Sequence, residues 1–447
     1  MPSPNVPRLT LWTLWTLWTL NASAFGQTKP ADKYDLIEIF DAKAMIRTEV
    51  QTSLTGRIAV PQAIQPGDKP KPPKVVTLVG RSRLAYDEVH RGIDADKNLI
   101  STRHYRELVI QRKLGDTEQG AEVRPAVRRV VLLRAPNGRK NPFSPDGALT
   151  LDEIEVLRRD LIGPALVTGL LPSTAAKPGQ SWPVGEQSVR ELTDYETIED
   201  NKLIVTFESV LKLGGRNHAR LGLKGSVRGS SEDGPNSQTM EGTIYFDLEN
   251  KILASFSLSA VAVIAAPDGK TTAGEIKGTL LLNRSRVALD ALLSLEKLPE
   301  ASLKLTEANG AVLLDEPELG LSFEHPRRWR ASRTTERGIT LEERTGGGAI
   351  VFNRVGTLPT AATQIEDAKA LAAKQNWTIL STGEPAKTGD LERFHQIVDD
   401  GKRKLRLDYA TLAAKTGGWV ITARTPDTKP NELLMQLDAL LASVKVK

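Results

Sequence analysis

Hydrophobic and polar residues alternate with a period of two over much of the chain between Lys43 and Val287. The clearest early run has its apolar and small polar positions at Ile46, Thr48, Val50, Thr52 and Leu54. Similar runs lie at 203–213, 244–248, 256–258 and 276–282. This period is typical of strands that bury one face and solvate the other. The pattern therefore predicts a β-rich antiparallel domain over 43–290, arranged as a barrel or half-barrel.

One helical segment interrupts these strands, near 150–171. Thr150 and Glu153 have the spacing of a capping box, and Pro164 ends or kinks the helix. The apolar positions recur at helical spacing, at Leu151, Ile154, Leu157 and Leu161. We expect this segment to pack on the sheet as a lid.

The region 315–447 has a different pattern. Short strands are predicted at 319–324, 339–344, 349–355, 391–398, 404–412 and 418–424. Thr363 and Glu366 predict the start of one helix, and a second follows Thr428 and Pro430. The apolar face of the final helix is Leu433, Leu437, Leu440 and Val444. This order predicts an α+β sandwich, joined to the first domain by a linker over 291–314.

Residues Leu319–Pro326 read LGLSFEHP and are followed at a short interval by Trp329. This opening, the order of elements and the terminal amphipathic helix resemble the Mog1/PsbP-like fold over about 315–447. The resemblance implies an α/β/α sandwich with the tryptophan in its core. It also implies an accessory or binding role and transfers no site residue to this chain.

The N-terminal region has a weaker resemblance. Leu171–Pro172, Pro178–Trp182 and Gly242–Asp247 are similar to motifs in a group of uncharacterised exported bacterial β-domains. No activity is attached to that group, so this resemblance supports the predicted fold and leaves the function open.

The first 24 residues have the three parts of a secretory signal peptide. Arg8 precedes the apolar run Leu9–Leu20, and Ala22-Ser23-Ala24 provides the small residues that signal peptidase requires. The run is shorter than the roughly 20 apolar residues of a membrane-spanning helix. We expect the mature chain to begin near Phe25 with a tether over 25–42. We also expect it to be exported to a periplasmic or extracellular space, without a transmembrane segment once the leader is removed.

Composition narrows the possible chemistry. The 447 residues are 40% hydrophobic and 26% charged, which suits packed cores. Sixty basic and 55 acidic residues nearly balance, so no dedicated polyanion surface follows from charge alone. The absence of cysteine excludes a thiol nucleophile, cysteine-ligated zinc and iron–sulfur clusters. Because we expect export, we predict no nucleic-acid partner.

Two basic clusters keep an anionic surface open as a partner, with a solvated surface as the alternative. They are Arg124, Arg128, Arg129, Arg134, Arg139 and Lys140, and then Arg327, Arg328, Arg330 and Arg333 around Trp329.

No local motif identifies a reaction. The five histidines are too far apart in sequence to form a metal motif, and they are His90, His104, His218, His325 and His395. No G-x-S-x-G motif occurs. The sequence thus assigns no catalytic, cofactor-binding or metal residue and implies no cofactor.

Three functions remain open. The main expectation is an exported, non-catalytic binding or accessory protein that acts on an unknown protein or component of the cell envelope. The second is a carrier that holds a lipophilic molecule between the N-terminal sheet and its helical lid. The third is a hydrolase with a dispersed site, which requires a histidine, a carboxylate and a serine to converge in one cleft.

Overall fold

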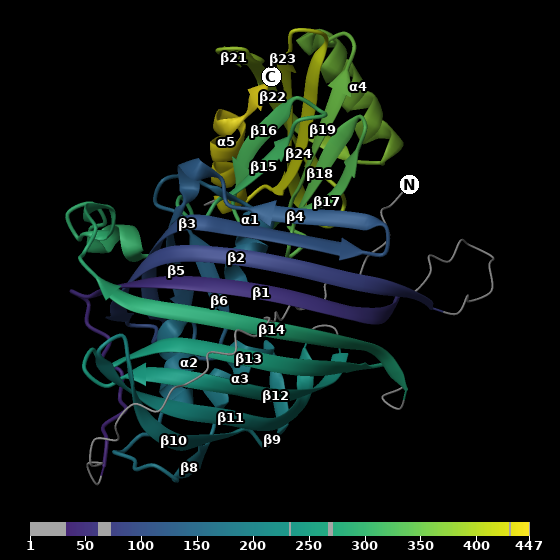
Figure 1. Ribbon diagram of the computed structural model, residues 1–447. Helices are drawn as coiled ribbons and strands as arrows, with labels where there is room; N and C mark the ends of the chain where they lie inside the picture. The colour runs from purple at the N-terminus through teal and green to yellow at the C-terminus, as the bar shows by residue number, and fades with distance from the viewer. Residues whose placement is uncertain (1–32, 61–72, 232–233, 267–270, 429–430, 447) are drawn as a thin grey trace. The chain divides into compact units, whose positions relative to one another are not determined.

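The computed structural model describes residues 33–60, 73–231, 234–266, 271–428 and 431–446 (Figure 1). The predicted signal peptide at 1–24 lies outside the described residues, as does the first part of the predicted tether. The chain divides into two compact units. The first is Met1–Gly147 with Asp152–Lys304, and the second is Ala148–Leu151 with Leu305–Lys447.

One large antiparallel sheet forms the first unit, and Figure 1 shows that it is strongly curved. Its neighbouring strands follow the order β6-β5-β3-β2-β1-β14-β13-β12-β11-β10-β8, with β4 on β3 and β9 on β11. The long strands are β1 (Met45–Val60), β2 (Lys74–Ile93), β3 (Leu99–Leu114), β10 (Ile204–Leu213), β11 (Arg216–Ser231), β12 (Gly234–Asp247), β13 (Ile252–Ala265) and β14 (Thr272–Val287). The short ones are β4 (Thr117–Glu122), β5 (Arg129–Arg134), β6 (Lys140–Phe143), β8 (Ser181–Pro183) and β9 (Thr197–Asn201).

The predicted antiparallel, β-rich fold is confirmed, whereas its closed-barrel form is wrong. A barrel closes only when its first and last strands pair. Here the two ends of the strand order are β6 and β8, which pair with β5 and β10. These end strands span only four and three residues, so they offer little backbone for closing the ring.

The alternating pattern of the sequence sets the two faces of this sheet. Ile46, Val50 and Leu54 of β1 are buried, whereas Glu49 and Gln51 are exposed. We call the face that carries Ile46, Val50 and Leu54 the inner face, and the opposite one the outer face. Alternation of this kind is what an antiparallel sheet with one wetted face requires.

Three short helices lie within 151–193, namely α1 (Leu151–Arg158), α2 (Gly163–Leu170) and α3 (Glu186–Thr193). The predicted helical segment is confirmed as α1 and α2, and Pro164 occupies the first turn of α2, where its missing N–H costs nothing. Glu153, one residue of the predicted capping box, accepts hydrogen bonds from Arg124 N and Nε at 2.9 and 2.8 Å. α3 has no counterpart among the elements predicted from the sequence.

The connector after β14 packs on the outer face. Leu293 and Leu298 are buried against Met45 and Val89, and they lie in a segment with two 3-10 turns, Ala291–Leu293 and Glu300–Leu303. Residues 291–304 of the predicted linker therefore have a defined structure and belong to the first unit.

The second unit contains an eight-stranded sheet and a small four-stranded one. The larger sheet has the order β17-β18-β19-β24-β23-β22-β20, with β21 on β22, and the smaller has the order β25-β16-β15-β7. The larger comprises β17 (Trp329–Thr335), β18 (Gly338–Glu343), β19 (Ala349–Val355), β20 (Thr378–Thr382), β21 (Ala386–Thr388), β22 (Leu391–Asp399), β23 (Lys404–Ala413) and β24 (Gly418–Pro426). The smaller comprises β7 (Leu149–Thr150), β15 (Val312–Glu316), β16 (Leu321–His325) and β25 (Lys445–Val446).

Two helices cover opposite faces of the larger sheet in this unit. Tyr409 of β23 packs in a cluster with Ala368 of α4 (Ala361–Lys374), whereas its neighbour Ala410 packs in the cluster of α5 (Glu432–Ser443). Successive strand residues point to opposite faces, so α4 and α5 lie on different sides. Trp329 is buried in the α5 cluster, as the family resemblance implied. Among the described residues, no helix is long and apolar enough to cross a membrane.

The backbone of Gly225 in β11 generates a first prediction. Its φ is +145°, and an added Cβ would lie 2.0 Å from the carbonyl oxygen of Lys202. We expect Gly225→Ala to reduce the free energy of unfolding of the first unit by about 1–3 kcal/mol. Gly120→Ala is the control, because a Cβ there meets nothing nearer than 3.7 Å. Chemical denaturation checks this, and equal midpoints for the two variants would contradict it.

Candidate functional site

Three cross-strand pairs bring polar side chains together on the inner face of β2 and β3. Alternate residues of a strand share a face, so residues 86, 88 and 90 project to the same side as their partners 105, 103 and 101. The pairs are Tyr86 with Tyr105, Glu88 with Arg103, and His90 with Ser101. All six side chains are buried. Charged side chains therefore occupy inward-facing strand positions, where leucine or valine is usual.

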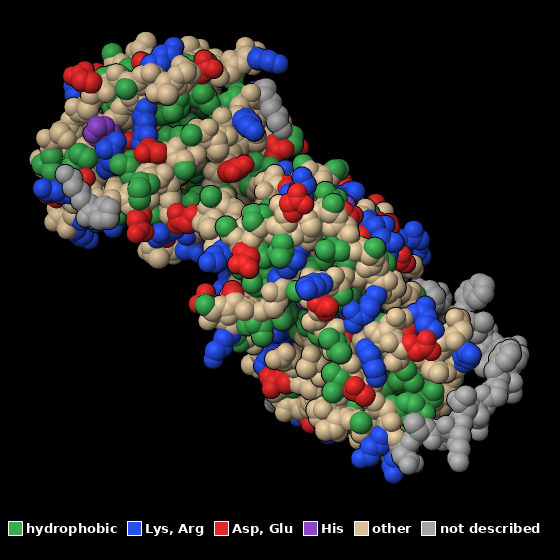
Figure 2. Space-filling model, turned by 90° about the vertical axis from the view of Figure 1, so that its left-hand side faces the viewer, with side chains coloured by type: hydrophobic (Ala, Val, Ile, Leu, Met, Phe, Trp, Pro, Cys, Tyr) green, Lys and Arg blue, Asp and Glu red, His purple; other side chains and the backbone are tan. Residues whose placement is uncertain are grey.

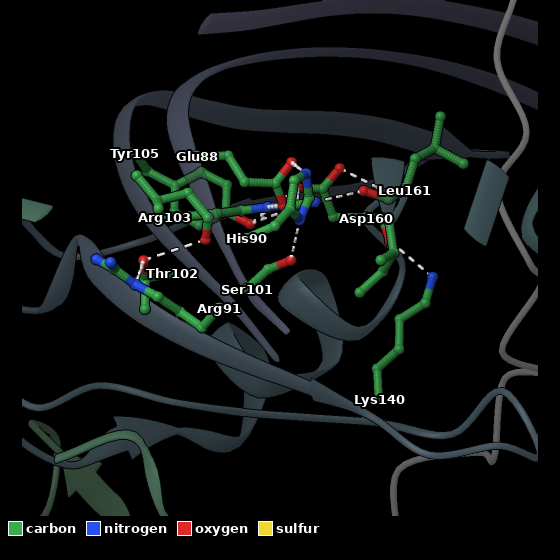
Figure 3. A network of polar contacts seen from close by, with 12 residues as sticks. Glu88, His90, Arg91, Ser101, Thr102, Arg103, Tyr105, Lys140, Asp160 and Leu161 are labelled. Carbon is green, nitrogen blue, oxygen red and sulfur yellow. Dashed lines mark hydrogen bonds and ion pairs between the residues drawn. The ribbon is translucent and has the colours of Figure 1, made fainter. Parts of the chain in front are cut away.

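Arg103 lies at the centre of this group and binds two carboxylates (Figure 3). Its Nε donates to Glu88 Oε1 at 2.7 Å, and its Nη1 donates to Asp160 Oδ2 at 2.5 Å. Its Nη2 donates to the carbonyl oxygen of Leu161 at 2.6 Å, and its Cζ lies 4.1 Å from the centre of the Tyr86 ring. The planar fork of the guanidinium thus joins the sheet to the chain between α1 and α2.

Two more basic residues hold the same part of the chain. Lys140 Nζ donates to the Asp160 carbonyl at 2.7 Å and lies 2.8 Å from Glu191 Oε2. Arg134 Nε donates to Glu191 Oε1 at 2.6 Å, and Ile162 N donates to Glu191 Oε2 at 3.1 Å. Because Glu191 belongs to α3, these contacts connect β5, β6, the α1–α2 junction and α3.

The segment before β1 joins through a bidentate ion pair. Arg284 of β14 donates from Nη1 and Nη2 to the two carboxylate oxygens of Glu38, at 2.9 and 2.8 Å. Leu253 N also donates to Glu38 Oε2 at 2.8 Å. Gly163, at the start of α2, lies against this region, since a Cβ there would be 3.2 Å from Arg284 Nη2 and 3.5 Å from Glu88 Oε2.

We call these eight charged residues the ion-pair network. Its acids are Glu38, Glu88, Asp160 and Glu191, and its bases are Arg103, Arg134, Lys140 and Arg284. Every one of these side chains is at most 9% exposed. Four carboxylates thus face four cations, which is the condition under which buried charge is tolerated.

Burial and neighbouring charge act in opposite directions on the acids. Burial alone would raise the pKa of Glu88, but Arg103, His90 and Arg284 outweigh it and hold that pKa below its usual range. Burial would likewise raise the pKa of Glu191, and Lys140 and Arg134 lower it further than burial raises it. Burial lowers the pKa of His90, because the charged imidazolium loses its hydration. Near neutral pH the two carboxyls are therefore ionised and His90 is neutral.

His90 brings together the three residue types that the hydrolase hypothesis requires. Its Nδ1 lies 2.9 Å from Ser101 Oγ, and its Nε2 lies 3.5 Å from Glu88 Oε2. However, Ser101 is fully buried, and the Phe40 ring packs edge-on against His90 at 4.9 Å between centres. Arg103 already binds Glu88. Because Ser101 has no surface that a substrate could reach, we assign this group a role in holding β2 to β3.

The other histidines lie apart from this group. His218 Nε2 is 3.9 Å from Asp247, and His325 Nδ1 is 3.0 Å from the Pro326 carbonyl oxygen. His104 is on β3, and the ring of His395 packs against Gly383. Within the described ranges, no three His, Cys, Asp or Glu side chains gather as a metal ion would require.

The predicted basic clusters are largely used within the fold. Four of the six basic residues in the first cluster form ion pairs, namely Arg124, Arg129, Arg134 and Lys140. In the second cluster, Arg328 lies 3.0 Å from Glu343, and Arg327 donates to the Gly310 carbonyl oxygen at 2.8 Å. On the face seen in Figure 2, acidic and basic side chains are interspersed. This arrangement favours the solvated-surface interpretation for most of these residues.

A second region of the inner face is apolar. Leu54, Ile58, Leu78, Leu114 and Ile276 form a buried cluster, and four partly buried side chains pack against it. These four are Val60, Val76, Ala262 and Ile264. All nine belong to β1, β2, β3, β13 and β14. We call this set the apolar cluster. Leu54 lies six residues beyond Thr48 on β1, or about 20 Å along the strand, and Thr48 pairs with Tyr86 and Arg284 beside the ion-pair network.

Comparisons with known proteins leave the family open. No family model matches the sequence, and no curated protein matches it. Among solved structures, the cyanobacterial PsbP (CyanoP) of Synechocystis sp. PCC 6803 is similar at 8% identity and a TM-score of 0.24, over 31% of this chain and 92% of that one. The apo immunity protein TplEi of the T6SS of Pseudomonas aeruginosa has 12% identity and a TM-score of 0.19, over 46% and 72%. The Tle4–Tli4 complex is similar at 10% identity and a TM-score of 0.20, over 46% of this chain and 73% of that one. The similarity to PsbP is thus weak, and these values support no functional argument.

Sequence reasoning did not find the ion-pair network, although one signal was present. Glu88, His90 and Arg103 occupy the inward parity of alternating strands, where charge is unusual. Their partner Asp160 lies in a separate segment, so the pairing itself required the tertiary structure.

The network predicts an asymmetry between two neighbouring arginines of β3. Arg103→Met leaves Glu88 and Asp160 buried without their main cation, and we expect a loss of about 3–5 kcal/mol in the free energy of unfolding. Arg106→Met is the matched control, because Arg106 is 45% exposed and pairs with Asp87 on the outer face. Its removal is expected to cost at most about 1 kcal/mol. Urea denaturation measures both, and similar costs would show that the network does not stabilise the unit.

His90 predicts that the stability of the first unit changes in a pH range above the one in which the carboxylates titrate. The folded pKa of His90 lies below its ordinary value of 6.5, so the unfolded chain takes up the proton first as pH falls. Stability is therefore lost below about pH 6.5, by up to about 1.4 kcal/mol per pH unit. The folded pKa values of Glu88 and Glu191 are also lowered, so their contribution is complete above about 4.5 and is lost as pH falls below it.

Hydrogen exchange of amides in α2 and α3 at pH 7.0 and 5.5 isolates the histidine contribution. We expect His90→Gln to abolish most of the difference in opening free energy between these two pH values. His104→Gln, on the opposite face of the sheet, should retain the wild-type difference. An unchanged difference in His90→Gln would contradict the assignment.

Proposed function

We propose that the first unit binds and carries a lipophilic molecule on the apolar part of its inner face. The observation that carries this proposal is the apolar cluster, whose described members all come from strands of one sheet. In a layered fold the facing apolar layer comes from a second element. Here a lipophilic ligand would complete that layer.

The ion-pair network supports a division of the inner face into one end that the helices cover and another end that carries the apolar cluster. Arg103, Lys140 and Glu191 hold α2, α3 and the α1–α2 junction over one end of the strands. The helices therefore have a fixed position, about 20 Å along the strands from the start of the apolar cluster. The predicted lid corresponds in this proposal to α1 and α2, which together with α3 cover one end and leave the other to the ligand.

The proposed carrier is one form of the expected binding or accessory role at the cell envelope. Export to a periplasmic or extracellular space remains part of this proposal, because a lipophilic molecule needs a protein to cross an aqueous compartment. For the second unit we propose an accessory role with a Mog1/PsbP-like sandwich fold. Its support is the buried Trp329 and the placement of α4 and α5 on opposite faces.

The test compares two neighbours on β2 that point to opposite faces. Leu78 is buried in the apolar cluster, and Val79 is 41% exposed on the outer face. With the full chain and the uncharged probe 1-N-phenylnaphthylamine, we expect Leu78→Gln to weaken binding at least tenfold, or about 1.4 kcal/mol. Val79→Gln should bind like the wild type. Fluorescence titration measures the affinity.

Two outcomes would contradict the carrier proposal. One is a wild-type chain that does not bind the probe, and the other is equal weakening by both substitutions. Circular dichroism of each variant shows whether it folds. Ala260→Leu, which adds an apolar side chain on the inner face, provides a second variant that introduces no buried polar group.

A further inference from the structure

Building on the proposed lipophilic ligand, we infer that it is a single-chain amphiphile with a carboxylate headgroup. We place its chain across the strands, along one row of small side chains, and its headgroup at Arg112. This inference rests on the proposed function and adds the class and orientation of the ligand.

The strand registers define the row. Each residue pairs with the next on the neighbouring strand, from β3 to β11, in the order Arg112, Gly80, Leu54, Gly278, Ala260, Met240 and Gly225. Four of these seven residues are glycine or alanine. Glycine inside a strand weakens the strand and marks places where a ligand or another backbone approaches closely. We call this row the furrow.

Bulkier rows border the furrow on both sides. One consists of Leu114, Leu78, Gly56, Ile276, Ala262, Gln238 and Val227. The other consists of Ile110, Ser82, Thr52, Leu280, Leu258, Gly242 and Leu223. Each contains four large aliphatic side chains, against two in the furrow. Neighbouring rows on one face are about 7 Å apart, and we propose that one acyl chain of the ligand lies between the two bulkier rows.

The length of the furrow suits an acyl chain. Because the backbone of Lys202 lies against Gly225, we measure the row from Gly80 on β2 to Met240 on β12, which is four strand spacings of about 4.8 Å, or about 19 Å. A bilayer core of about 30 Å contains two acyl chains end to end, so one chain occupies about 15 Å. A single chain therefore fits along the row, whereas a two-chain lipid would require a second row.

Arg112 supplies charge at one end of the furrow. It is 8% exposed and lies on the inward parity of β3, whereas its neighbour Lys113 is exposed on the outer face. A guanidinium has five N–H donors and binds a carboxylate through two parallel hydrogen bonds, so it can do so alongside a contact within the protein. A cation at the end of an apolar row matches an amphiphile whose acid lies at one end of its chain.

The experiment measures binding of cis-parinaric acid and its methyl ester by the full chain, using the fluorescence of the polyene. We expect the wild type to bind the acid at least tenfold more tightly than the ester. Arg112→Gln should remove this preference, Arg112→Lys should keep part of it, and Lys113→Gln should leave it unchanged. Ala260→Leu should weaken both ligands, whereas Ser259→Leu, on the outer face, should weaken neither.

The outcomes separate this inference from the carrier proposal. Equal affinity for acid and ester in the wild type would overturn the headgroup assignment and leave the carrier proposal standing. Competition by a two-chain phosphatidylglycerol as effective as that of palmitate would overturn the single-chain assignment. Unchanged binding in Ala260→Leu would overturn the furrow as the path of the chain. If neither ligand nor the uncharged probe bound, both proposals would fail.

Discussion

The first unit depends on the pairing of buried charges. Removing a carboxylate or guanidinium from water costs several kcal/mol for each ion, and this cost is offset only when geometry and hydrogen bonds are good. Arg103 meets this condition, because its donors reach Glu88, Asp160 and the Leu161 carbonyl oxygen together. Asp160 Oδ2 in turn also accepts a hydrogen bond from the Tyr105 hydroxyl at 2.8 Å. The helices above the sheet therefore have one position in which all the charges are satisfied.

The same sheet carries two kinds of inner surface because its strands are long. β1 spans 16 residues, so one strand places Thr48 beside the charged side chains and Leu54 and Ile58 in the apolar cluster. A single register fixes both regions at once, since a slip by one residue would turn every side chain to the other face. The charges hold the covering helices at one end, and the hydrophobic surface at the other end is left to strand residues. Structure and proposed function are linked through this register.

Local patterns were sufficient for most of the elements and insufficient for the site. The parity of Ile46, Val50 and Leu54 predicts a wetted antiparallel sheet, and the spacing of Leu433, Leu437 and Leu440 predicts α5. Whether a sheet closes is decided by its end strands, and β6 and β8 are too short to give a sequence signal. The spacing of Thr150 and Glu153 gave no sign that Glu153 also binds Arg124, which lies 29 residues earlier in the chain. The ion-pair network joins residues as far apart as Glu38 and Arg284, so no local window contains it.

The side chains under these helices are charged where leucines could have stood, and this difference has a physical consequence. Hydrophobic contact is non-directional, so an apolar layer would hold α2 and α3 on the sheet without fixing their position along it. The fork of Arg103 and the two oxygens of Glu191 accept partners only in defined directions, which fixes the α1–α2 junction relative to β3, β5 and β6. The cost is sensitivity to protonation, because each pair depends on an ionised carboxylate. Because directional bonds fix the helices at one end, the other end of the inner face does not have to hold them. The row of small residues there is the path that we propose for the acyl chain of the ligand.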